Sequence, residues 1–438
     1  MQMSIGEEKN ISGCKDDNES FRHDYNLTMI FCIILSAVLT INFFLPNDYL
    51  SLLCTAAAIV KLFLCKKKEL LPLMIYFTFL AYLFCFQNYN IYIFVCLAFI
   101  IRAALLTKEN LVFTIVGIPV YFATHLLSSI NTDFSIGDLI PLFCVMILMY
   151  ACNMYDEKSR NAYIYFFIAG HIVTSFLGLT RNIGRLTVSE HLYNDSLRFS
   201  GLSYDPNFYA ITAVITLCIL LLGFGYKFKT WKWLAATIIT LSFGVITYSK
   251  SLLFCFAAII LISFLTAERN VKSNILKALP LFLILCFVFS KQLFGVYEAF
   301  KARFNAVDSF DSLTTGRVTL WKIYAADIFK SAESIFFGNG ISPSIKKAAH
   351  NTYLEILQKF GLIGAVTDAI FLYACNKKIK SKFKLSFTSV FVILLLAALL
   401  FFLSAYTFYG FWQCIFIVMI LIRKDEQNAE TVNSYSGI

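Results

Sequence analysis

The 438 residues are 59% hydrophobic and only 15% charged, and 17% are aromatic. A soluble globular chain carries about 25% charged residues, so this chain has too few polar side chains to cover a surface that faces water. The mean hydropathy of +0.71 agrees with this. The composition therefore predicts an all-α polytopic membrane protein, because helices satisfy their own backbone groups in lipid.

Fourteen apolar runs follow one another along the chain, and each is predicted to be a transmembrane helix. They cover 27–44, 49–65, 70–86, 91–106, 111–127, 139–155, 162–179, 208–226, 234–248, 252–266, 278–289, 353–375, 385–403 and 411–422. Several are shorter than the ~20 residues that cross a bilayer untilted, and two of the shortest could be re-entrant or fused, so twelve spans are also compatible with the pattern. Mostly polar residues precede the first run, which is therefore expected to be a retained span rather than a signal peptide.

The distribution of positive charge predicts the orientation. With the N-terminus inside, inner links hold most of the Lys and Arg, whereas the short outer links 45–48, 87–90, 128–138 and 404–410 hold none. We therefore expect cytoplasmic tails at 1–26 and 423–438, helical bundles at 27–179, 208–289 and 353–422, and long outer loops at 180–207 and 290–352.

The two long outer loops depart from this pattern because they are rich in cations. They contain Arg181, Arg185, Arg198, Lys291, Lys301, Arg303, Arg317, Lys322, Lys330, Lys346 and Lys347. Long translocated loops escape the orientation rule, so these charges are free to serve another purpose. Solvated loop surface is one interpretation, and a cationic basin for an anionic substrate on the outer face is the other.

Two helix starts are predicted at the outer surface. Asp205 is a candidate N-cap, and Pro206 suits the first helical position. Thr352 and Glu355 have the spacing of a capping box, which predicts a helix from Tyr353 and puts His350 two residues before the cap. Helix N-termini together with arginines favour phosphate binding.

A third outer helix is predicted within the large loop. Six apolar residues recur at helical spacing after Arg317 and give one apolar face: Leu320, Trp321, Tyr324, Ala325, Ile328 and Phe329. We expect this helix to lie on the outer leaflet and to end at Gly338-Asn339-Gly340.

Several chemistries are disfavoured by what the sequence lacks. It has no GxxxxGK[ST] loop for an ATP-driven pump and no Asp-x-Asp pair for a metal-bound sugar nucleotide. Its five His show no HExxH spacing, and its thirteen Cys form no CxxC pattern. No metal, cofactor or nucleic-acid partner is expected, and the absence of an evident internal repeat weakens a transporter with inverted repeats.

Five motifs together resemble the bacterial O-antigen ligase and polymerase family. They are Arg198…Gly201…Asp205-Pro206-Asn207, Ser249-Lys250-Ser251, Gly316-Arg317…Trp321, Gly338-x-Gly340, and His350-Asn351 followed after nine residues by Gly361-x-x-Gly364. The motifs run from Arg198 to Gly364, and the first seven predicted spans match only in hydropathy.

The resemblance implies a helical bundle like that of GT-C glycosyltransferases, in a bacterial cytoplasmic membrane, with the site on the outer face. The implied donor is a glycan on polyprenyl diphosphate, and no metal is needed. The implied roles are diphosphate binding for Arg198 and Arg317, and proton acceptance from the acceptor hydroxyl for His350. Supporting roles are expected for Lys250, Arg303, Arg185, Asp205, Asn207 and Asn351. Lys250 stands where many members have Arg, which removes the forked geometry of a guanidinium.

Three functions remain open at this point. A polymerase of lipid-linked repeat units for O-antigen, capsule or exopolysaccharide is preferred, because the outer loops show no added domain for a distinct acceptor. A ligase would use a lipid core or another terminal acceptor instead. A flippase of the same lipid-linked glycan is the third, although the cations gather outside rather than along a path between helices. Expected partners are the donor, a glycan or lipid acceptor, membrane lipid, a flippase and a chain-length regulator.

Overall fold

The computed structural model describes residues 24–42, 45, 47–87, 89–107, 116–127, 139–186, 199–203, 205–222, 230–247, 249–266, 294, 297, 301, 311, 314, 316–340, 345, 348–379, 386–404 and 408–422. After a first helix, Asp24–Asn42, the helices are α2 Asp48–Leu64, α3 Lys67–Phe79, α4 Tyr92–Leu106, α5 Ile118–Leu126, α6 Ile140–Met154, α7 Arg160–Leu186, α8 Pro206–Leu221, α9 Thr230–Val245, α10 Lys250–Thr266, α14 Arg317–Ile328, α15 Ala332–Phe337, α16 Thr352–Lys378, α17 Phe387–Phe401 and α18 Phe411–Leu421.

Every predicted span that falls within the described residues contains a helix, and the run 278–289 lies outside them. By length and composition, Asp24–Asn42, Glu157–Thr180 and Thr352–Lys378 are long and apolar enough to cross a membrane, and further apolar helices have 10–17 residues. The expected all-α membrane architecture agrees with this, and the number of spans stays a prediction.

The third predicted span ends earlier than the hydropathy suggested. Helix α3 stops at Phe79, and the chain continues as a short 3₁₀ helix, Ala81–Leu83. A hairpin follows, made of two antiparallel strands of two residues each, β1 Cys85–Phe86 and β2 Tyr89–Asn90. The side chain of Asn90 fixes this turn, because its amide donates to the carbonyl of Ala81 and its oxygen accepts the N–H of Tyr92.

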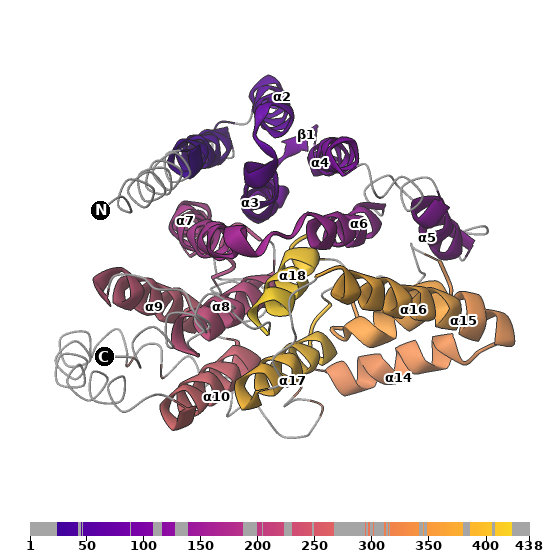
Figure 1. Ribbon diagram of the computed structural model, residues 1–438. Coiled ribbons are helices and arrows are strands. Elements are labelled where there is room, and N and C mark those ends of the chain that lie inside the picture. Colours follow the sequence, from indigo (N-terminus) through magenta and orange to yellow (C-terminus); the bar gives the residue numbers. More distant parts are fainter. Residues whose placement is uncertain are drawn as a thin grey trace, which may run out of the picture.

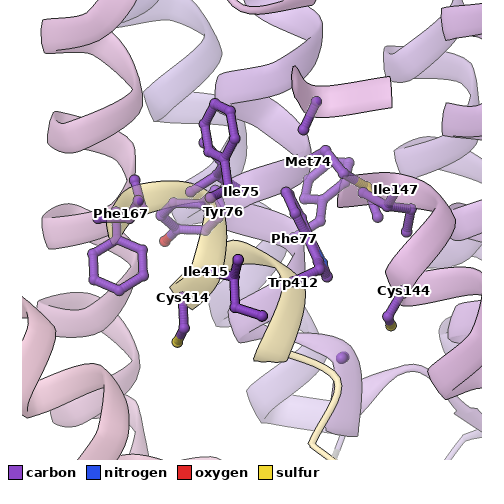
Figure 2. Packing of buried hydrophobic residues seen from close by; sticks show 14 of the residues in the cluster. Met74, Ile75, Tyr76, Phe77, Cys144, Ile147, Phe167, Trp412, Cys414 and Ile415 are labelled. Carbon is purple, nitrogen blue, oxygen red and sulfur yellow. The ribbon is translucent and has the colours of Figure 1, made fainter. Parts of the chain in front are cut away.

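The helices pack around a central apolar core, and Figure 1 shows how they are arranged. Helices α2 to α4 lie on one side of the molecule, α14 to α16 lie together on another, and α18 lies in the middle. Figure 2 shows side chains of α3, α6, α7 and α18 meeting in this core, among them Tyr76, Ile147, Phe167 and Trp412. Both α3 and α18 are buried around most of their circumference, as expected of helices that are apolar on all sides.

Two of the segments predicted to lie outside differ from the sequence-based boundaries. Helix α7 continues to Leu186, so Arg181 and Arg185 lie on helical backbone rather than in a loop from residue 180. No proline interrupts the helix there. The helix expected from Arg317 to Gly338 is two helices, because the chain turns at Phe329–Lys330 and Ser331 caps α15 by accepting the N–H of Ser334.

Helix α16 is bent near its start. Gly361 has φ +62° and ψ −166°, which breaks the helix into a short first part and a longer second part. The second part carries Asp368, an acidic residue within the predicted span 353–375. Its carboxylate accepts the hydroxyl of Tyr121 at 2.8 Å and lies 3.2 Å from His125 Nε2, so both of these polar neighbours come from α5.

Candidate functional site

The start of α16 is capped differently from the sequence-based prediction. Asn351, not Thr352, is the N-cap, and its side chain accepts the N–H of Leu354 at 3.1 Å. The hydroxyl of Thr352 donates to the carbonyl of Leu403 at 2.6 Å, and Glu355 accepts the N–H of Ala349 at 2.9 Å. The predicted capping box is therefore wrong, because Thr352 bonds Leu403 and Glu355 bonds Ala349 and Ser404.

His350 lies in the turn that enters α16. Its backbone has φ +50°, in the left-handed region that few residues other than glycine adopt. Its N–H donates to Ser404 Oγ at 3.0 Å, and the Ser404 hydroxyl donates to Glu355 Oε1. The half-buried His350 is thus held by the segment that follows α17.

Arg317 reaches the same segment from the start of α14. It is the first residue of α14, and its Nη1 donates to the carbonyl of Phe402 at 2.7 Å. One turn later, Trp321 Nε1 donates to the carbonyl of Ala349 at 2.9 Å, and its ring packs against Phe401. The structure therefore brings Arg317 and His350 to one short stretch, Phe402–Ser404.

The glycine motifs form one structural unit with the bend in α16. The N–H groups of Asn339 and Gly340 donate to the carbonyls of Gln358 and Lys359, at 2.7 and 3.1 Å. These carbonyls lie just before Gly361, where the helix breaks and leaves carbonyls without intrahelical donors. The Gly338-x-Gly340 motif thus docks α15 onto the bend.

A half-buried polar network joins α14 to this unit. The Asp327 carboxylate accepts hydrogen bonds from Asn339 Nδ2, Gln358 Nε2 and Lys330 Nζ, each at 2.9 Å. Nearby on α14, burial and then the negative charge of Glu355 raise the pKa of Tyr324 to about 12. Tyr324 therefore stays protonated near neutral pH and is not a candidate base.

The predicted start of α8 is confirmed. Asp205 Oδ1 accepts the N–H of Asn207 at 2.8 Å, and Pro206 is the first helical residue. Asn207 Oδ1 accepts the hydroxyl of Ser249 at 3.4 Å, a long bond, and Lys250 is the first residue of α10. Three of the predicted supporting residues, Asp205, Asn207 and Lys250, therefore belong to two adjacent helix N-termini, whose positive dipole ends favour anions.

The link between α17 and α18 touches both groups of residues. At one end, Phe402 and Ser404 accept from Arg317 and His350. At the other end, the ring of Phe408 stacks on Phe208 in the first turn of α8, with centroids 4.9 Å apart. Sequence reasoning missed this link, because its residues carry no recognisable motif.

An apolar cavity of about 460 Å³ lies beside the starts of α14 and α16. Its lining residues are Val318, Trp321, Lys322, Ala325, Asn351, Tyr353, Leu354 and Phe401. Two of these lining residues adjoin candidate site residues in the sequence, Val318 next to Arg317 and Asn351 next to His350.

Some predicted site residues lie outside this description. Arg198 and Arg303 fall outside the described residues, and of Arg185 only the helical backbone is described. Within the described part of the chain, no group of three or more His, Cys, Asp or Glu could hold a metal ion.

Comparison with known proteins adds one match. Residues 235–367 match the family model described as O-antigen ligase. This part of the chain is similar to the O-antigen ligase family. The resemblance inferred from the motifs is thereby confirmed, since the matched segment contains Lys250, Arg317, Gly338, His350 and Gly361. No curated protein and no solved structure matches the chain. The O-antigen ligase segment covers less than half of the chain, and it supports a membrane enzyme that acts on lipid-linked glycans.

Proposed function

We propose that the protein is a glycosyltransferase of a bacterial cytoplasmic membrane that polymerises oligosaccharide repeat units carried on polyprenyl diphosphate, such as undecaprenyl diphosphate, at the outer face. One observation carries the proposal. The O-antigen ligase match includes both Arg317 and His350, and both residues hydrogen-bond the same stretch, Phe402–Ser404.

The donor diphosphate binds Arg317 together with Arg198. Guanidinium forks suit diphosphate oxygens because they form paired, charge-assisted hydrogen bonds. Lys250 adds a point charge at the first turn of α10, beside the N-terminus of α8. The polyprenyl chain occupies the apolar cavity of about 460 Å³ next to Arg317, which keeps the hydrocarbon out of water while the diphosphate stays at the cations.

His350 accepts the proton of the acceptor hydroxyl. The hydroxyl oxygen then attacks the anomeric carbon, the bond from that carbon to the diphosphate oxygen breaks, and the polyprenyl diphosphate leaves. Attack opposite the leaving group inverts the anomeric centre. A neutral imidazole suits this role, because its ordinary pKa near 6.5 lets it take up a proton near neutral pH.

The acceptor decides between two members of the same enzyme class. Another lipid-linked glycan as acceptor makes the protein a polymerase, which is the interpretation we favour because the sequences of the predicted outer loops show no added domain. The description of the matched family favours the alternative, a ligase that moves the glycan to a lipid core or another terminal acceptor. Either enzyme would work with a flippase, and the polymerase with a chain-length regulator.

Transfer by the purified protein in nanodiscs tests the proposal, with lipid-linked repeat units from the source cells as donor. His350→Ala should fold and insert, bind undecaprenyl diphosphate as the wild type does, and lose about 10²–10⁴ in transfer rate. A variant rate within a few-fold of wild type would remove His350 from the mechanism. In a deletion strain, glycans of a single repeat unit indicate a lost polymerase, and long chains left on the carrier lipid indicate a lost ligase.

A further inference from the structure

Glu355 is the centre of the hydrogen bonds around His350. It is 1% exposed, and its Oε1 accepts both the N–H of Ala349, at 2.9 Å, and the hydroxyl of Ser404. Ser404 Oγ in turn accepts the N–H of His350 at 3.0 Å. The carboxylate therefore holds the two consecutive N–H groups of the turn, one directly and one through Ser404.

This turn needs such support because its backbone is strained. His350 has φ +50°, and a residue with a Cβ persists in that region only where its surroundings fix it. A third bond reaches the turn from α14, where Trp321 Nε1 donates to the carbonyl of Ala349 at 2.9 Å. The backbone of the Ala349–His350 turn is thus held by groups on α14, α16 and the link after α17.

Burial of this carboxylate is costly for stability. Within the described part of the chain, Glu355 Oε2 is buried and has no hydrogen-bond partner. An apolar side chain of similar volume would avoid that cost. Costs of this kind are usually kept at functional sites, where strain and buried charge serve the mechanism.

We propose that Glu355 is a positioning residue for His350. Its carboxylate fixes the Ala349–His350 turn, through Ser404 as a relay, so that the imidazole faces the acceptor hydroxyl at the moment of transfer. The inference rests on the proposed role of His350 as the proton acceptor. It predicts that loss of Glu355 lowers the rate of transfer and leaves the affinity for the donor unchanged, because Arg317 binds Phe402 independently of Glu355.

The experiment uses the full-length protein in nanodiscs and measures two quantities separately: the affinity for undecaprenyl diphosphate and the transfer rate with lipid-linked repeat units from the source cells. Glu355→Ala should lower the transfer rate at least ~10-fold and change the affinity less than about two-fold. Glu355→Gln should recover part of the rate, because the amide oxygen still accepts both bonds. Glu333→Ala, at an exposed glutamate of α15, is the matched control and should match wild type.

The outcomes separate this inference from the proposed function. If His350→Ala abolishes transfer while Glu355→Ala and Ser404→Ala transfer at the wild-type rate, the positioning role is wrong and the base stands. If His350→Ala itself transfers normally, the proposed base is wrong. Should Glu355→Ala fail to fold, the transfer rates of Glu355→Gln and Ser404→Ala test the inference in its place. Wild-type transfer rates in both variants overturn the inference, and lowered transfer rates at unchanged donor affinity support it.

Discussion

The two helix starts of the candidate site, those of α8 and α16, are held together in different ways. At α8, the cap lies within three consecutive residues, because Asp205 accepts the N–H of Asn207 across Pro206. At α16, the turn before the helix is held by Leu403 and Ser404, which follow α17, and by Trp321 of α14. The first start is a local structure, and the second is an assembly of distant segments.

The difference shows which of the two helix starts depends on the packing of distant segments. The cap of α8 takes its hydrogen bond from within the same segment, which suits a fixed site for an anion at the helix dipole. A start assembled from three segments places His350 only when α14, α16 and the link after α17 are all docked. Proton acceptance would therefore depend on the packing of α14 and α16 against that link, whereas anion binding at the α8 start would not.

The largest expected effect comes from a substitution of Gly361, at the bend of α16. Gly361→Ala should destabilise the protein by about 2–5 kcal/mol, because a Cβ at φ +62° would be strained and would run into the backbone carbonyl of Phe336. Gly316→Ala is the matched control: its φ of +77° is also left-handed, but a Cβ there meets no atom within 4 Å. Thermal unfolding in nanodiscs compares the two, and equal losses would mean that the contact with α15 contributes nothing.

The start of α16 also shows which features of the structure the sequence does not predict. Hydropathy predicted the helices within the described residues, and Asp205-Pro206 predicted the α8 start, since both signals are local. The N-cap of α16 was predicted one residue too late. A capping box would have Thr352 and Glu355 each bond the other's backbone N–H, but Thr352 bonds Leu403 and Glu355 bonds Ala349. Nor could the sequence indicate that Phe402–Ser404 joins Arg317 to His350, since that pairing exists only after α14 and α17 pack together.

The next prediction concerns the cation at the assembled start. Arg317→Ala should weaken the binding of undecaprenyl diphosphate about 10–100-fold, the usual loss for hydrogen bonds to a charged group, and Arg317→Lys should rescue only part of it. Lys382→Ala, in a predicted inner link, should have no effect. If Arg317→Ala binds undecaprenyl diphosphate as tightly as wild type, Arg317 is not part of the diphosphate site. The transfer rate of the variant would then show whether Arg317 acts on His350 through Phe402.

A smaller effect compares the two caps directly. Asp205→Ala and Asn351→Ala should each cost about 1 kcal/mol of stability, the usual cost of losing an N-cap. Only Asn351→Ala should also lower transfer out of proportion to the lost stability, because the cap adjoins His350. The conservative variants Asp205→Asn and Asn351→Asp should restore stability. Equal ratios of transfer to folded protein in the two alanine variants would contradict the contrast between the starts.

The smallest effect is the acid sensitivity of the network that docks α14 on the assembled start. Burial raises the pKa of Asp327, but hydrogen bonds from Gln358, Lys330 and Asn339 outweigh it and leave the pKa below its ordinary value. A carboxyl group with a lowered pKa in the folded state stabilises the protein above its unfolded pKa of about 4, and this stability is lost as pH falls through the folded pKa. Between pH 5 and pH 3 the melting temperature of wild type should therefore fall more than that of Asp327→Asn, whose amide does not titrate. Glu333→Gln, which removes an exposed carboxyl from the adjacent α15, should keep the wild-type slope. If the melting temperatures of wild type and Asp327→Asn fall equally with pH, the network holds α14 equally well without the charge.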